Sequence, residues 1–125
     1  MIYGIGTDIV AVGRLSEMYV RHGERALEKL LAGSEREDCR RSGAPGRFLA
    51  KRFAAKEAFG KALGTGVRAP ALLPSIAVMH DPLGKPFFEY APELAKYLAV
   101  RGLIAHLSLS DESDSVLAFV VLEKS

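Results

Sequence analysis

Two carboxylates, Asp8 and Glu57, stand where acidic side chains are unusual. Asp8 lies in GIGTDIV (residues 4–10), a strand-like stretch in which a charge among isoleucine and valine needs a reason. Alternation along a strand places Asp8 on the same face as Gly4 and Gly6, which leave room for another backbone or a ligand to approach. The simpler alternative is an aspartate that caps the following helix.

Glu57 lies in GRFLAKRFAAKEAFGKAL (residues 46–63), where strong helix formers and the absence of proline predict a helix. It shares a helix face with small or apolar residues, so its carboxylate either extends along that face to reach water or needs a cation. Lys61, one turn further on, could supply that cation in an ordinary i,i+4 pair. Basic residues on several sides of this helix instead indicate contacts from more than one direction, with bound anions as one explanation.

Together, Asp8 and Glu57 offer hard oxygen ligands. Neither has the dense carboxylate spacing of a calcium loop, and no Cys/His cluster suits zinc. Mg²⁺ takes one or two protein carboxylates and completes its shell with water and phosphate oxygens. Lys61, Arg52 and His106 could hold the remaining phosphate charge. The residues by themselves predict a Mg²⁺-dependent site for a phosphorylated ligand, and no more.

Two further segments have alternative interpretations. Gly64, Thr65 and Gly66 follow the long helix and could turn N–H groups toward a phosphate, although the pattern is not a P-loop and a helix C-cap at Gly64 is the alternative. In HLSLS (residues 106–110) the histidine and serines share one face, which is either a solvated strand side or the lining of a polar cleft. No G-x-S-x-G motif supports a Ser-His-Asp hydrolase.

The order of the expected helices and strands around these residues predicts an α+β fold, with a mostly antiparallel sheet packed with helices. The length predicts a single domain over residues 1–125. A strand (1–10) precedes a helical stretch (11–31) broken near Gly23 and a short helix that opens with Ser34 and Glu37 at capping-box spacing. After the long helix we expect a hairpin with strands at 75–81 and 85–91, then a helix at 92–102. A second hairpin follows, with strands at 103–110 and 115–123. The last strand is apolar throughout, so we expect helices or another subunit to cover both of its faces.

Composition excludes several classes of protein. The net charge of +2 does not by itself indicate nucleic acid, and a single cysteine forms no internal disulfide. MIYGIG has no basic region of the signal-peptide kind, and the longest apolar run, VLAFVVL, is too short to span a membrane. We therefore expect a cytoplasmic protein with neither a nucleic-acid nor a membrane partner.

Three motifs in order, GIGTDIV, RFLAKRFAAKEAFGKALGTG (residues 47–66) and HLSLSD (residues 106–111), closely resemble the holo-[acyl-carrier-protein] synthase family. This is the small stand-alone class of 4′-phosphopantetheinyl transferases, and GKP (residues 84–86) is also similar to it. The resemblance implies transfer of the 4′-phosphopantetheine arm of coenzyme A to a serine hydroxyl of apo-acyl carrier protein. Adenosine 3′,5′-bisphosphate is released, and the reaction belongs to fatty acid biosynthesis.

The resemblance also implies roles for residues. Asp8 and Glu57 match the family's Mg²⁺ carboxylates, and Lys61 matches a lysine near the pyrophosphate, so all three are candidate catalytic residues. The serine proton could pass to Glu57, to a water on the metal or to His106, and a water held by Glu57 is preferred. The positions that match the lining of the coenzyme A site are Lys61, Arg52, Gly64, Thr65, Gly66 and His106.

Partners follow from the same resemblance. Arg14, Met18 and Arg21 share a helix face with Arg25, and family members use such residues to dock the acidic carrier protein, although a solvated face is the alternative. The family implies a homotrimer with one site at each subunit interface, because 125 residues hold only one of the two halves that the larger class of transferases carries. Two rival functions remain: a non-catalytic Mg²⁺–nucleotide-binding module, and a structural oligomer that needs neither carboxylate.

Overall fold

A computed structural model describes all residues, 1–125, and its order of elements agrees with the sequence prediction. The helices are α1 (Val12–His22), α2 (Glu24–Leu30), α3 (Gly33–Arg41), α4 (Pro45–Leu63) and α5 (Pro92–Arg101). The strands are β1 (Ile2–Ala11), β2 (Ile76–His80), β3 (Pro86–Tyr90), β4 (Leu103–Asp111) and β5 (Ser115–Lys124), and a 3₁₀ turn covers Leu73–Ser75. None of the helices is both long and apolar enough to cross a membrane.

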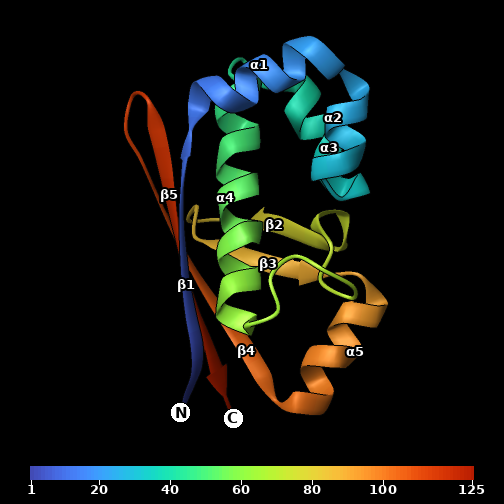
Figure 1. Cartoon of the computed structure of the whole chain (residues 1–125), viewed down its shortest axis with the longest axis vertical. Coiled ribbons are helices and arrows are strands. Elements are labelled where there is room, and N and C mark those ends of the chain that lie inside the picture. Colours follow the sequence, from blue (N-terminus) through green and yellow to red (C-terminus); the bar gives the residue numbers. More distant parts are fainter.

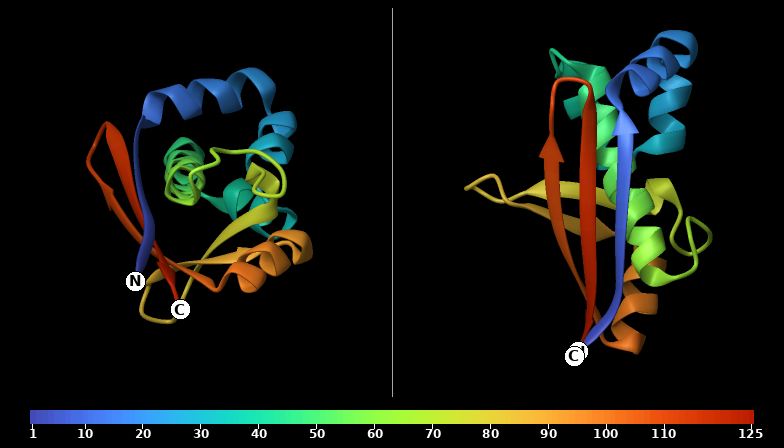
Figure 2. Two further views of the ribbon diagram at one scale, coloured as in Figure 1. Left: turned by 60° about the horizontal axis from the view of Figure 1, so that its bottom comes forward. Right: turned by 60° about the vertical axis from the view of Figure 1, so that its left-hand side comes forward.

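The strands form two antiparallel sheets rather than one. β1, β5 and β4 make a three-stranded sheet in that order, and β2 and β3 pair as a separate hairpin that projects beyond it (Figure 2). Helix α4 runs along one face of the three-stranded sheet, with α1 to α3 toward one end and α5 at the other (Figure 1). The predicted α+β class is therefore confirmed, with the sheet divided in two.

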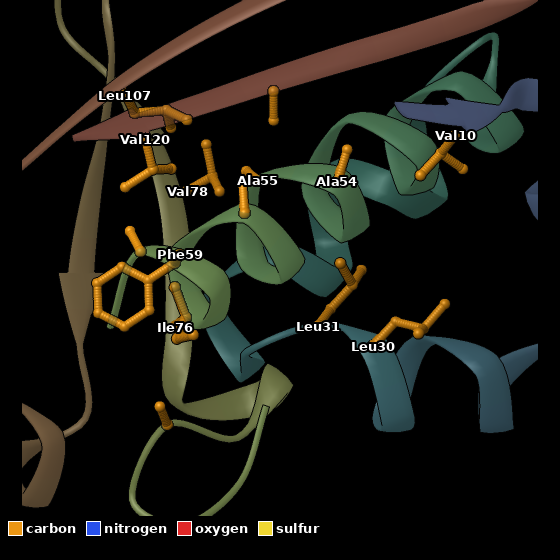
Figure 3. Close-up of a cluster of buried hydrophobic side chains, with 14 of the residues drawn as sticks. Val10, Leu30, Leu31, Ala54, Ala55, Phe59, Ile76, Val78, Leu107 and Val120 are labelled. Carbon is orange, nitrogen blue, oxygen red and sulfur yellow. The ribbon is translucent and has the colours of Figure 1, made fainter. Parts of the chain in front are cut away.

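Helix α4 is the centre of the molecule. Pro45 opens it at a position where a missing N–H costs nothing, and Gly64 closes it in the left-handed region with φ 88°. Buried residues surround it on nearly every side because the sheet covers one face and α1 to α3 and the β2–β3 hairpin cover others. Figure 3 shows Phe59 of this helix packed among Ile76, Val78 and Val120.

Strand β1 approaches α4 closely at its two glycines. A Cβ added at Gly4 would overlap the carbonyl oxygen of Ala62, and one added at Gly6 would overlap the carbonyl oxygen of Ala58. The helix faces the strand with a row of alanines, Ala50, Ala54, Ala58 and Ala62. The glycine face of β1 therefore admits a backbone, that of α4 in the same chain, in preference to a ligand.

The start of α3 differs from the sequence prediction. The helix begins at Gly33, and the carboxylate of Glu35 accepts a hydrogen bond from the backbone N–H of Ala32 at 2.8 Å. The predicted box of Ser34 and Glu37 is wrong because Glu35 turns inward, whereas Glu37 pairs on the surface with the arginines of the last turn.

One face of β5 is uncovered. Val116, Ala118, Val120 and Leu122 are buried against α4, whereas Leu117 and Phe119 remain 40% and 39% exposed on the other face. Helices of this chain cover only one face of the strand, so of the two predicted coverings only another subunit is left for the second face. The outer face of the three-stranded sheet is left available to a further partner.

Replacing Gly6 with alanine is expected to destabilise the fold by about 3 kcal/mol, because the new methyl group would overlap a helix carbonyl that cannot move without shifting α4. Gly13→Ala is the matched control, since nothing lies within 4 Å of its added Cβ, and it should be neutral or stabilising by up to about 1 kcal/mol. Urea unfolding at one protein concentration measures both. Equal stability of the two variants would contradict the close approach.

Candidate active site

Asp8 lies on β1 with its side chain turned toward α4. Lys61 of α4 donates one hydrogen bond to Asp8 Oδ1 at 3.1 Å and another to the carbonyl oxygen of Thr7 at 2.9 Å. The aspartate is mostly buried, whereas the lysine is more than half exposed. Asp8 does not cap the next helix, since α1 begins after Ala11 without any side-chain cap. The helix-cap alternative is therefore wrong.

Glu57 lies on α4 one turn before Lys61, half-buried. Burial raises the pKa of Glu57 above its ordinary 4.5, and the negative charge of Asp8 raises it further, while Lys61 and Arg14 oppose the shift. Arg14 reaches this region from α1, with its guanidinium 5.5 Å from the centre of the Phe53 ring. Two carboxylates that repel each other thus lie near two cations, and the hydrogen bonds of Lys61 go to β1 instead of to Glu57.

This donor set fits a small divalent cation with outside ligands. No group of three or more His, Cys, Asp or Glu side chains gathers where it could hold a metal ion, so a closed protein cage is absent. Mg²⁺ is commonly held by one or two carboxylates and completes its shell with water and phosphate oxygens. Burial and the nearby charge of Asp8 both raise the pKa of Glu57, and a bound cation would relieve the repulsion between the two carboxylates.

The glycine loop after α4 closes the helix. The N–H of Gly64 donates to the carbonyls of Gly60 and Lys61, and the N–H of Gly66 donates to Gly60 at 3.0 Å. The hydroxyl of Thr65 donates to the carbonyl of Gly66. The helix C-cap alternative is therefore confirmed, and these two glycine N–H groups are already bonded within the chain.

Arg52 lies about 140° around α4 from Glu57, on another side of the helix. Its Nε is 3.1 Å from Glu35 Oε2, and its guanidinium stacks 4.1 Å from the centre of the Phe48 ring. It lines a hollow of about 410 Å³ together with Arg47, Lys51 and His80. The chain does not bring Arg52 to the Asp8 cluster; it places it in a separate basic hollow.

His106 lies on β4, which β5 separates from β1. Its side chain is exposed on the outer face of the sheet, where Nε2 lies 3.0 Å from Glu123 Oε1. Asp8 points to the opposite face, toward α4. A single chain therefore does not bring His106 together with Asp8, Glu57 and Lys61.

The candidate carrier-protein residues Arg14, Met18 and Arg21 all lie on α1. The helix ends at His22 and breaks at Gly23, as predicted, so Arg25 belongs to α2. Arg21 pairs with Glu17 at 3.1 Å, and both side chains are well exposed. A hollow of about 590 Å³ lies beside Met18 at the junction of α1 and α2, and its other lining residues are His22, Arg25, Ala26, Glu28 and Lys29.

A buried ionic group escaped the sequence prediction. Lys56, next to Glu57, points into the protein and contacts Glu35 of α3. The charges around α4 were explained in part by bound anions, but Lys56, Arg52, Arg47 and Lys61 all have acidic partners in the same chain. The sequence signal for this buried group was Lys56 itself, a lysine in a helix whose other buried residues, apart from Arg52, are small or apolar.

Comparison with known proteins gives the family. The model of the 4′-phosphopantetheinyl transferase superfamily matches residues 4–120. A holo-[acyl-carrier-protein] synthase of Dechloromonas aromatica is 62% identical over 123 residues, which cover 98% of each chain. The chain belongs to the 4′-phosphopantetheinyl transferase superfamily. This confirms the resemblance read from the three motifs and the expected class of enzyme.

Solved structures agree with this assignment. The crystal structure of a holo-[acyl-carrier-protein] synthase from Neisseria meningitidis superposes with a TM-score of 0.95 at 49% identity, covering 99% of this chain and 100% of that one. A synthase from Bacillus anthracis, crystallised in complex with coenzyme A (3′,5′-ADP), has a TM-score of 0.83 at 35% identity and covers 100% and 99% of the two chains. The fold is thus that of a known group of synthases.

Removing the charge of Asp8 is expected to lower the pKa of Glu57 toward 4.5, because the repulsion between the carboxylates disappears while the burial remains. Arg14→Ala is the opposite control and should raise that pKa, since it removes a favourable positive charge. A carbon-detected NMR titration of the Glu57 carboxyl in Asp8→Asn, Arg14→Ala and the unmodified protein, all without metal, measures the shift. An unchanged pKa in Asp8→Asn would show that the carboxylates do not interact.

Proposed function

We propose that this chain, as one transferase domain, moves the 4′-phosphopantetheine group of coenzyme A to a serine hydroxyl of an apo-acyl carrier protein. Adenosine 3′,5′-bisphosphate leaves. Membership of the transferase superfamily and 62% identity to a holo-[acyl-carrier-protein] synthase over nearly the whole chain support this reaction. The single structural observation that carries it is the convergence of Asp8, Glu57 and Lys61 between β1 and α4.

Asp8 and Glu57 are proposed to hold Mg²⁺, the cofactor of the reaction. Two nearby carboxylates, one of them with a raised pKa, support this assignment, and the phosphates of coenzyme A would supply further oxygens. When bound, Mg²⁺ would offset the negative charge that develops on the departing phosphate. This assignment requires Lys61 to share Asp8 with the ion or to move toward the substrate, which its exposed ammonium allows.

Side chains of this chain are proposed to take the other roles in the transfer. Lys61 is proposed to place a fixed positive charge beside the pyrophosphate of coenzyme A. The serine oxygen bonds to the β-phosphorus as the bond from that phosphorus to the bridging oxygen breaks. The serine proton passes to a water held by the carboxylate of Glu57.

The nucleotide end of coenzyme A needs a basic surface away from the reacting phosphate. The hollow lined by Arg47, Lys51, Arg52 and His80 is proposed to receive an anionic group of the nucleotide. Its arginine and lysine side chains are partly neutralised by Asp111, which lies 3.1 Å from Arg47 and 3.4 Å from Lys51. The loop at Gly64, Thr65 and Gly66 is proposed to contact coenzyme A beside Lys61, at the same end of α4.

The carrier protein is proposed to dock on α1. Arg14, Met18 and Arg21 present two cations and an apolar side chain, and the hollow beside Met18 offers a place for a side chain of the partner. Acyl carrier proteins are acidic, so this face would raise the rate of encounter more than the final affinity. Arg14 lies at the end of this face nearest Glu57, which would direct the carrier serine toward the Asp8 cluster.

A homotrimer is proposed because the outer face of the three-stranded sheet is apolar and uncovered. Its exposed side chains include Ile5 and Ile9 of β1, Leu117 and Phe119 of β5 and Ile104 of β4. Exposed apolar side chains gathered on one face of a sheet mark an interaction surface. His106 lies on the same face. In a trimer, the His106 of one chain would lie near a neighbouring chain and could complete that chain's site, which one chain alone does not assemble.

The reaction is tested by mass spectrometry of an apo-acyl carrier protein incubated with Mg²⁺, coenzyme A and the enzyme. We expect the carrier to gain the mass of one phosphopantetheine group. Lys61→Ala should slow the transfer by about 10²–10³-fold, because a charge on the developing anion is lost, and Asp8→Asn and Glu57→Gln should slow it at least as much. Coenzyme A binding without a mass gain would favour the non-catalytic module instead, and full activity of both carboxylate variants would contradict the proposed metal site.

The trimer is tested by light scattering after size-exclusion chromatography. Ile5→Asp would place a charge in the proposed interface and is expected to give monomers with greatly reduced transferase activity. Val100→Asp, which puts the same charge on the exposed face of α5, is the control and should remain a trimer with full activity. A fully active monomer of the unmodified chain would rule out sites shared between subunits.

A further inference from the structure

The group around Glu35 is the most deeply buried set of charges in the protein. Glu35 is 1% exposed, Lys56 is 0% exposed, and Arg52 is buried beside them. Glu35 Oε1 accepts from Lys56 Nζ at 2.6 Å and from the N–H of Ala32 at 2.8 Å. Oε2 accepts from the N–H of Val78 at 2.9 Å and lies 3.1 Å from Arg52 Nε. Both carboxylate oxygens therefore have hydrogen-bond partners, while the buried Arg52 Nε contributes its charge without a hydrogen bond.

Lys56 extends the same network to α2. Its ammonium donates to the carbonyl of Leu30 at 2.8 Å, at the end of that helix, where carbonyls have no partner within the helix. Burial lowers the pKa of Lys56 to about 8, and the Glu35 carboxylate opposes that shift, so the ammonium stays charged at neutral pH. The network therefore joins α2, α3, α4 and β2 through directional bonds.

Apolar packing is not the only constraint on the rotation of α4. The helix is buried on nearly all sides rather than along a single apolar stripe. Toward β1 it presents alanines against glycines, and the carbonyls of Ala58 and Ala62 lie close to the strand. The bond between Lys61 and Asp8 lies at the surface, where such pairs contribute little.

Lys56 and Glu57 are neighbours that point about 100° apart around α4. Fixing Lys56 on Glu35 therefore fixes the direction in which Glu57 leaves the helix, and Lys61 follows one turn later. Buried polar groups with complete partners specify one arrangement, whereas apolar packing of similar volume tolerates several.

We infer that Lys56 and Glu35 are positioning residues for the transferase reaction: their buried ion pair sets the rotation of α4 that holds Glu57 and Lys61 against Asp8. This inference rests on the proposed function of that site. It assigns to Lys56 no contact with coenzyme A or the carrier protein, because its ammonium faces the interior on the far side of the helix.

The test separates positioning from stability with two variants. Lys56→Met alone leaves a buried carboxylate without its main cation and should lower Tm sharply. Adding Glu35→Gln removes that carboxylate charge but leaves Arg52 without its acidic partner, so the double variant E35Q/K56M should regain part of the lost Tm. Lys96→Met on the exposed face of α5 is the matched control and should behave like the unmodified protein.

Each protein is assayed well below its Tm, after circular dichroism has shown it to be folded. For E35Q/K56M we expect kcat to fall about 10–100-fold, the usual effect of losing a partner that orients a ligand, with a smaller change in KM for coenzyme A. Binding of Mn²⁺ to the protein without coenzyme A, followed by electron paramagnetic resonance, should weaken by a similar factor. This second readout does not depend on turnover.

A folded double variant with unmodified kcat and Mn²⁺ affinity would overturn the inference and leave the network a purely structural role. Failure of both E35Q/K56M and Glu35→Gln to fold would also count against it, because the network would then act through stability. An unmodified chain that transfers no phosphopantetheine would refute the proposed function, while the comparison of Mn²⁺ binding between variants would still decide the positioning role.

Discussion

The close approach of β1 to α4 governs the rest of this structure. Because Gly4 and Gly6 have no side chains, the strand can lie directly on the helix backbone at Ala58 and Ala62. That contact places Asp8 two residues further along the same face, within reach of the lysine and glutamate of α4. A larger residue at either glycine would lift the strand, and the carboxylates would no longer share one site.

The charged side chains around α4 form two groups that differ in burial and in how well their charges are balanced. On one side, Asp8, Glu57 and Lys61 form a partly exposed group whose like charges remain incompletely balanced, as the raised pKa of Glu57 indicates. On the other, Glu35, Lys56 and Arg52 form a buried group in which both carboxylate oxygens accept hydrogen bonds and two cations lie beside them. We propose that the unbalanced group accepts an ion and a substrate, and infer that the balanced group holds the helix in the orientation that presents it.

Local pattern predicted the elements well, because β1, α4 and the cap at Gly64 each depend on neighbouring residues. Spacing also singled out Asp8, Glu57 and Lys61, which the structure brings near one another, since a charge on a small-residue face stands out within one element. The occupant of the space beside the glycines could not be predicted, because a gap does not specify what fills it. Glu35 and Lys56 were missed because their partnership depends on how α3 packs against α4, and the same burial overturned the predicted cap at Ser34.

The pairing of β1 with β5 has a consequence for how the protein folds. Asp8 lies opposite Ala118, so the strand that carries the first carboxylate finds its sheet partner near the other end of the chain. Contacts between such distant residues close a large loop and form late and slowly compared with local helices. Helix α4 can therefore form early with Glu57 and Lys61 in place, while the half of the site contributed by Asp8 is completed only when the last strand docks.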